Sequence, residues 1–94
     1  VMAHISHLYI NGACIYFTIL FKPDVDTYWE IWNKAMEATL RNGGSISHHH
    51  GVGIVRSRWL KYELGNALNV LRSIKRALDS RGMLNTKNGM FFTD

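Results

Sequence analysis

Five histidines give this 94-residue chain most of its capacity for chemistry near neutral pH. Three of them are consecutive and two lie near the N-terminus: His48, His49, His50, His4 and His7. An imidazole titrates near neutral pH, ligates metals, and donates or accepts hydrogen bonds. The sequence therefore predicts a polar site that includes the triplet.

Residue types alone leave two interpretations of the triplet open. A zinc site would use imidazole ligands, but the spacing matches no familiar zinc pattern and there is no cysteine pair. A substrate-binding or catalytic cluster needs no such spacing. A third explanation is an expression tag. Because the run is internal and has only three histidines, a tag is disfavoured. Gly51 and Gly53 follow directly, and glycine lets the backbone approach another group closely.

The two N-terminal histidines lie in a predicted β-hairpin over residues 3–21. Asn11-Gly12 is a strong signal for a two-residue turn, because both residue types adopt positive φ. This turn pairs Ile10 with Ala13, Leu8 with Ile15, and His7 with Tyr16. One face is then apolar, with Leu8, Ile10, Ile15, Phe17, Ile19 and Phe21. The other is mixed, with Ile5, His7, Tyr9, Cys14, Tyr16 and Thr18.

Helical patterns follow the hairpin. Thr27-x-x-Glu30 is a capping-box pattern, and an apolar stripe follows it at helical spacing: Trp29, Trp32, Met36 and Leu40. Asn42-Gly43-Gly44 ends this helix. We expect a short strand within residues 45–53, a helix over about 63–78, and an irregular tail over 83–94. This β-β-α-β-α order is an α+β fold, close to an incomplete ferredoxin-like unit with an antiparallel sheet and two helices.

Composition excludes several classes of protein. Hydrophobic residues make up 47% and charged residues 19%, which excludes a disordered chain. The single cysteine, Cys14, excludes a disulfide scaffold and favours a reducing, cytoplasmic compartment. The longest apolar stretch, over residues 13–21, is too short to cross a bilayer, and no signal peptide is visible. No glycine-rich phosphate loop occurs, so a cofactor would be bound mostly by residues outside this chain.

The net charge of +4 comes from the second half of the chain, which contains eight basic residues and three acidic ones. No nucleic-acid motif accompanies this excess, so we expect no nucleic-acid partner. A solvated helix face or an anionic substrate explains it better.

Residues 43–53, which read GGSISHHHGVG, resemble the histidine-triplet motif of the alkyldihydroxyacetone phosphate synthases and their bacterial relatives. These are FAD-linked oxidases of the vanillyl-alcohol oxidase type. Further stretches agree in the same order: residues 12–17 resemble the family's strand that carries a catalytic tyrosine, Arg56-x-x-Trp59-Leu60 follows the histidines, and residues 71–79 and 82–85 resemble its closing helix and C-terminal signature.

This resemblance implies that residues 1–94 form the C-terminal part of a cap, or substrate, domain, and that an FAD-binding domain lies elsewhere in the same polypeptide. The isolated chain is then expected to bind no FAD and to be inactive. The substrate would be a small molecule, phosphorylated or lipid-like. Tyr16 would transfer a proton, and His48, His49 and His50 would orient the substrate and support the flavin chemistry. His7 and Arg56 would bind substrate, Gly51 and Gly53 would lie against the cofactor, and no metal ligand is predicted.

Two alternatives stay open. One is the cap of an FAD-dependent D-2-hydroxyacid dehydrogenase, acting on glycolate or D-lactate. Those enzymes carry Gly-Glu-His-Gly-Ile-Gly and a His-x-Gly-Asp-Gly-Asn type of motif, whereas this chain has His49 in place of the glutamate and lacks the Gly-Asp-Gly run. The other is a non-catalytic interaction domain that self-associates through the unpaired edges of its hairpin.

Overall fold

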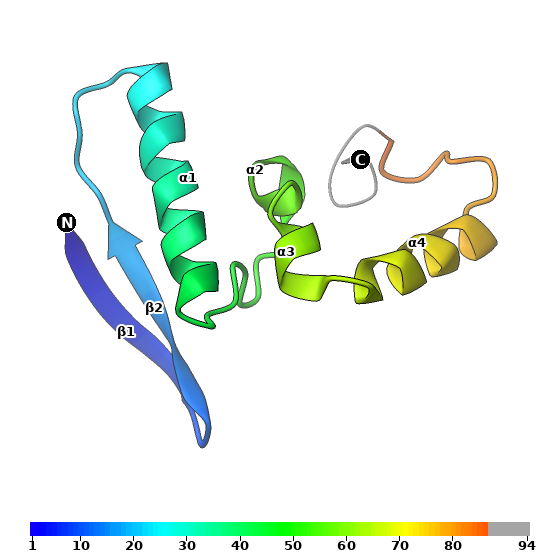
Figure 1. Cartoon of the computed structure of the whole chain (residues 1–94), viewed down its shortest axis with the longest axis horizontal. Helices are drawn as coiled ribbons and strands as arrows, with labels where there is room; N and C mark the ends of the chain where they lie inside the picture. Colours follow the sequence, from blue (N-terminus) through cyan, green and yellow to red (C-terminus); the bar gives the residue numbers. More distant parts are fainter. Residues whose placement is uncertain (87–94) are drawn as a thin grey trace. The chain divides into compact units, whose positions relative to one another are not determined.

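The computed structural model of the chain describes residues 1–86. The elements follow in the order β1 (Met2–Tyr9), β2 (Gly12–Thr18), α1 (Val25–Arg41), α2 (Gly53–Ser57), α3 (Leu60–Leu64) and α4 (Ala67–Leu78) (Figure 1). They divide into two compact units, Val1–Lys34 and Ala35–Asp94, with the boundary inside α1. Residues 87–94 of the expected tail lie outside the described part.

β1 and β2 form the predicted antiparallel hairpin, but the predicted register is wrong. Tyr9 pairs with Gly12 across the turn, so the two turn residues are Ile10 and Asn11. Neither Asn11 nor Gly12 has the positive φ that an Asn-Gly turn would use. Further along, His4 pairs with Tyr16, where the sequence predicted His7.

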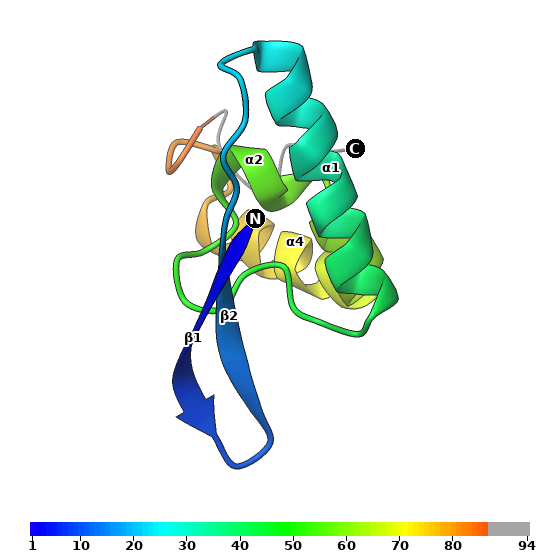
Figure 2. The same cartoon turned by 90° about the vertical axis from the view of Figure 1, so that its left-hand side faces the viewer.

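Two features cause this difference: the turn forms one residue earlier than predicted, and β1 has a bulge at His7. The pairing shifts between Ser6 and Leu8, which leaves His7 as an extra residue with a φ of 51°. Histidine is among the residue types that most often adopt a left-handed conformation. A bulge also increases the local right-handed twist of a hairpin, which is visible in Figure 2.

The bulge changes which side chains share a face, because paired residues lie on the same side of a sheet. His4, on the same face as its partner Tyr16, becomes a neighbour of Cys14. Ile5 pairs with Ile15 and so moves from the predicted mixed face to the apolar face. No residue among 1–34 is fully buried, and Ile5, Ile15 and Phe17 are 60%, 50% and 62% exposed.

α1 begins with a different cap from the predicted one. The Asp24 carboxylate accepts a hydrogen bond of 2.7 Å from the Thr27 backbone N–H, so Asp24 caps the helix in place of the Thr27–Glu30 box. Glu30 instead forms an ion pair of 2.6 Å with Lys34. Tyr28 stacks on Trp32 with ring centroids 6.0 Å apart.

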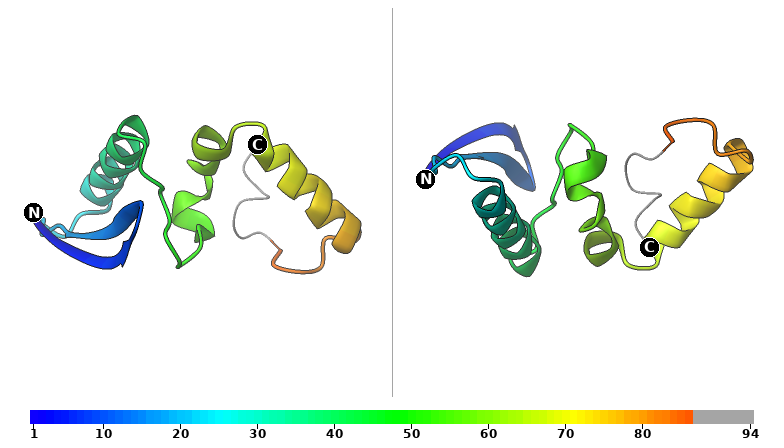
Figure 3. Two further views of the ribbon diagram at one scale, coloured as in Figure 1. Left: turned by 90° about the horizontal axis from the view of Figure 1, so that it is seen from below. Right: turned by 90° about the horizontal axis from the view of Figure 1, so that it is seen from above.

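The second unit contains most of the buried residues. Met36, Ile46, Leu60 and Leu68 are at most 8% exposed, and Ser57 is buried beside them. Residues 45–52 are irregular, so the expected strand does not form there. The expected helix over 63–78 is divided into α3 and α4 at Gly65, whose φ of 51° interrupts a helix (Figure 3).

Asp79, the residue that follows α4, is held by an ion pair and by backbone hydrogen bonds. Its carboxylate bonds with the Lys75 ammonium and accepts hydrogen bonds from the backbone N–H groups of Met83 (2.8 Å) and Leu84 (2.9 Å). Lys75 also donates to the Leu84 carbonyl at 2.7 Å. These contacts, chiefly the hydrogen bond from Lys75, lower the pKa of Asp79 to about 2.

The α+β class is confirmed, with a two-stranded antiparallel sheet followed by helices. The arrangement agrees with an incomplete unit, although residues 1–86 form four helices in place of the expected strand and two helices. None of the helices among residues 1–86 is long and apolar enough to cross a membrane.

Candidate functional site

The first group of candidate residues lies on the polar face of the hairpin. The Tyr16 hydroxyl oxygen is 3.4 Å from Nδ1 of His7. The ring centroids of His4 and His7 lie 5.9 Å and 6.2 Å from that of Tyr16. In a regular strand, residues three apart lie on opposite faces. The bulge therefore places both imidazoles beside one phenol.

Tyr16 is half-buried, and its surroundings keep it protonated. Desolvation, followed by the hydrogen bond and charge of neighbouring Cys14, raises the pKa of Tyr16 above its ordinary value. At neutral pH the side chain is thus a phenol, which can donate a proton.

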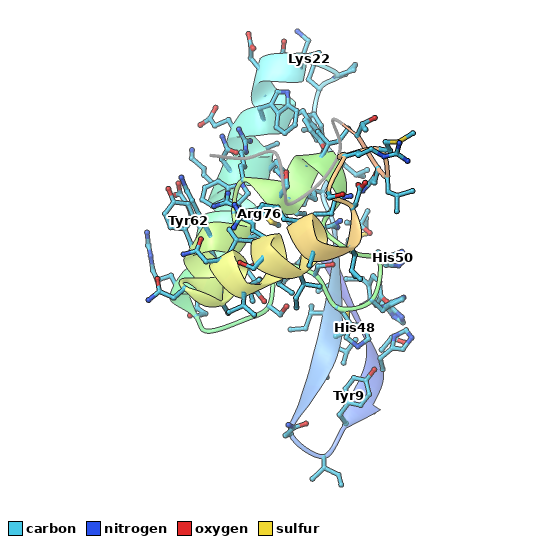
Figure 4. All side chains as sticks on the ribbon, turned by 90° about the vertical axis from the view of Figure 1, so that its right-hand side faces the viewer. Tyr9, Lys22, His48, His50, Tyr62 and Arg76 are labelled. Carbon is cyan, nitrogen blue, oxygen red and sulfur yellow. The ribbon has the colours of Figure 1, made fainter. Side chains whose placement is uncertain are left out.

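The histidine triplet lies in the irregular loop between α1 and α2, and all three side chains are exposed. His48 and His50 are labelled in Figure 4. The ring centroids of His48 and His49 are 4.6 Å apart, and those of His49 and His50 are 4.2 Å apart. Nδ1 of His48 and Nδ1 of His49 are separated by 2.5 Å. The three imidazoles therefore form a contiguous group.

Polar contacts hold both ends of this loop. At its start, Glu63 of α3 accepts a hydrogen bond of 2.7 Å from the Ser45 hydroxyl and one of 3.1 Å from the Ile46 backbone N–H. At its end, the Ser47 hydroxyl donates to the Gly51 carbonyl at 2.7 Å. We call the hydrogen bonds to Glu63 the anchor and the hydrogen bond from Ser47 to Gly51 the bridge. The triplet lies between them.

Gly51 and Gly53 have φ values of 74° and 51°, which explains why glycine occupies both positions. A Cβ added at either position would meet no atom within 4 Å. The backbone conformation, and not crowding by a neighbouring group, therefore requires glycine at these two positions. Arg56 is half-buried in α2, the helix that follows.

The structure thus brings His7 together with Tyr16, and the triplet together with Gly51. These are two groups, the first in the unit Val1–Lys34 and the second in the unit Ala35–Asp94. Among residues 1–86, no three His, Cys, Asp or Glu side chains form a group that would hold a metal ion.

Sequence reasoning missed three residues around these groups. His4 was missed because the predicted regular register places it on the other face of the sheet from His7 and Tyr16. Glu63 was assigned only as the start of a helix, and Ser47 only to a strand. The one feature of the sequence that could have pointed to any of these residues is the serine directly before the triplet, Ser47.

Comparison with known proteins places the chain in a family. Residues 1–88 match the family described as "FAD linked oxidases, C-terminal domain". The chain is similar to the alkyldihydroxyacetonephosphate synthase of Dictyostelium discoideum, with 37% identity over 92 residues, which cover 93% of this chain and 15% of that protein. It is similar to the FAD-linked oxidoreductase YgcU of Escherichia coli, with 41% identity over 91 residues, covering 88% and 19%.

A third relative is the alkyldihydroxyacetonephosphate synthase of Trypanosoma brucei brucei, with 32% identity over 87 residues, covering 87% of this chain and 14% of that protein. The chain spans less than a fifth of the length of these three relatives. No solved structure matches the chain significantly.

Proposed function

Because the chain belongs to the FAD-linked oxidases, whose C-terminal domain it matches over residues 1–88, we propose that it forms part of the substrate domain of a flavoenzyme. In this proposal the FAD-binding domain belongs to the same polypeptide. The substrate is a small molecule of the phosphorylated, lipid-like class named by the synthase relatives. A bound flavin would supply the electron-accepting ring, and this chain would hold the substrate and handle protons.

Tyr16 is the proposed proton-transfer residue. Its raised pKa keeps the proton on the hydroxyl oxygen until a substrate group takes it. His7, with Nδ1 3.4 Å from that oxygen, would hydrogen-bond to the phenol and return a proton after the transfer. The hydrogen bond is long, as is common before a substrate is bound, and it would tighten in the complex.

The histidine triplet is proposed to orient the substrate. Neutral imidazole offers one donor and one acceptor nitrogen, so three adjacent rings can contact several oxygens of one substrate. Arg56 would contact a phosphate group, since a guanidinium forms paired hydrogen bonds with phosphate oxygens. Gly51 and Gly53 would lie against the flavin, where their open backbone leaves room.

The observation that carries this proposal is the pairing of Tyr16 with two imidazoles on one face of a domain that matches the FAD-linked oxidases. A tyrosine alone on a sheet face would be an ordinary aromatic residue. The neighbouring imidazoles can donate and accept hydrogen bonds, and so can assist Tyr16 as acid and base in one catalytic cycle.

The test is Tyr16→Phe in the complete flavoenzyme that carries this domain. We expect turnover to fall by about 10²- to 10⁴-fold, the range of general acid–base catalysis. Bound flavin, measured by its absorption, should stay at the level of the unaltered protein, because the ring is retained. Tyr62→Phe is the matched control, since Tyr62 of α3 is 65% exposed. Normal turnover in Tyr16→Phe would refute the assignment.

A further inference from the structure

We infer that Glu63 and Ser47 are positioning residues that hold the histidine triplet in the geometry that the reaction requires. This inference rests on the proposed function, because it assigns a purpose to the order of the triplet. It adds two residues to the proposed function: Glu63, which lies outside the histidine motif, and Ser47, which lies inside the motif but has no role in the proposed function.

Glu63 is suited to anchoring the loop. Both of its carboxylate oxygens are used: Oε1 accepts from the Ser45 hydroxyl and Oε2 from the Ile46 backbone N–H. Hydrogen bonds to an ionised carboxylate are stronger than those between neutral groups. Glu63 lies on α3, which is fixed to the interior by Leu60, only 5% exposed. The anchor therefore connects the loop to a packed element.

Ser47 controls the other end of the loop. Its hydroxyl spans the three histidines to reach the Gly51 carbonyl at 2.7 Å, closing a short ring of backbone around them. The Ser47 backbone N–H also lies 3.4 Å from the Ser45 hydroxyl oxygen, so the bridge adjoins the anchor. Together the anchor and the bridge restrict an exposed loop that has no regular secondary structure.

Removing the anchor should disturb the triplet more than it disturbs the fold. Ile46 is 5% exposed and would still be held by apolar burial in Glu63→Ala. The loop that follows would lose its polar support. A misplacement of catalytic groups by about 1 Å can reduce the rate by about 100-fold. We therefore expect kcat to fall by roughly 10- to 100-fold in Glu63→Ala.

The experiment compares Glu63→Ala, Glu63→Gln and Ser47→Ala in the complete flavoenzyme. Glutamine keeps one accepting oxygen, and its amide group can donate to the Ser45 oxygen, so Glu63→Gln should recover most of the activity. Glu37→Ala, which removes an exposed glutamate of α1, is the matched control. Steady-state kinetics give kcat and KM, flavin absorption gives cofactor content, and hydrogen–deuterium exchange reports the order of residues 45–51.

The inference predicts a lower kcat, a KM within about twofold of normal, and unchanged flavin content in Glu63→Ala. Backbone amides over residues 45–51 should exchange faster, since Ile46 N–H loses its acceptor. Ser47→Ala should show the same pattern with a smaller effect. A change in folding alone would lower flavin content and kcat together and would not be rescued by Glu63→Gln. That result would overturn the inference.

A variant with alanine at positions 48, 49 and 50 separates this inference from the proposed function. If that variant is inactive while Glu63→Ala keeps normal exchange and normal kcat, the inference is wrong and the proposed role of the triplet stands. If the triple-alanine variant turns over normally, the triplet has no role in the reaction. The proposed role and the positioning inference then both fall.

Discussion

Replacing His7 tests whether the bulge in β1 serves the proposed chemistry or only the shape of the hairpin. His7→Asn removes the imidazole but keeps a residue type that adopts a left-handed conformation readily. His7→Gly removes the side chain and accepts the φ of 51° without strain. His7→Val removes the imidazole and adds a β-branched side chain, which disfavours this backbone conformation.

The expected magnitudes differ for stability and for turnover. A left-handed conformation costs an L-residue roughly 1–2 kcal/mol, and β-branching places valine at the upper end. His7→Val should therefore lower the unfolding midpoint, while the asparagine and glycine variants stay near the unaltered protein. Loss of the 3.4 Å contact between His7 and Tyr16 should reduce turnover by about tenfold or less, because the hydrogen bond is long.

The assay measures turnover in the complete flavoenzyme alongside thermal unfolding followed by circular dichroism. The reasoning predicts similar turnover losses in His7→Asn and His7→Gly, at nearly unchanged stability. Full turnover in both variants would show that the imidazole does not assist Tyr16. Equal stability of the valine and asparagine variants would refute the argument that the bulge constrains the residue at position 7.

Two further predictions concern the second unit. The Asp79 carboxylate has its pKa lowered to about 2, below the value near 3.9 of an unfolded chain, so the stabilisation it provides is present above about pH 4 and is lost as the pH falls toward 2. Asp79→Asn should unfold at a lower temperature at pH 5, and the difference should shrink between pH 4 and 2; a difference independent of pH would contradict this. Leu68→Ala should lower the free energy of unfolding by about 2–5 kcal/mol in urea titrations, because Leu68 is 3% exposed. Leu78→Ala, at an 81% exposed position of the same helix, should change it by less than about 0.5 kcal/mol, and equal effects would show that burial does not set the cost.

The features of the fold that depend on local patterns were predictable from sequence. The apolar stripe of α1 includes Met36, which is buried, and the helix ends at the glycines, where Gly43 has a φ of 70°. The hairpin forms as expected. Its register was not predictable from the Asn-Gly signal, because the turn forms one residue earlier and the bulge at His7 absorbs an extra residue.

The errors in the second unit have a physical cause in tertiary contacts. Residues 45–53 suited a strand by composition, but a strand requires a partner, and the polar groups there bond to Glu63 and to each other. The apolar spacing over 63–78 predicted one helix, whereas Gly65 divides it. The contact between His7 and Tyr16 was predicted from a wrong pairing, and the structure reaches it through the bulge.

The exposed apolar face of the hairpin has a consequence for the order of folding. A two-stranded hairpin alone is marginally stable in water, and residues 1–34 include no fully buried side chain. The loop that carries the triplet, in contrast, is tied by hydrogen bonds to α3, which packs into the interior through Leu60 and so resists local opening. We therefore expect the histidines to become ordered early in folding. Tyr16 should be among the last residues to gain protection from hydrogen exchange, because its hairpin becomes stable only when another part of the polypeptide packs on it.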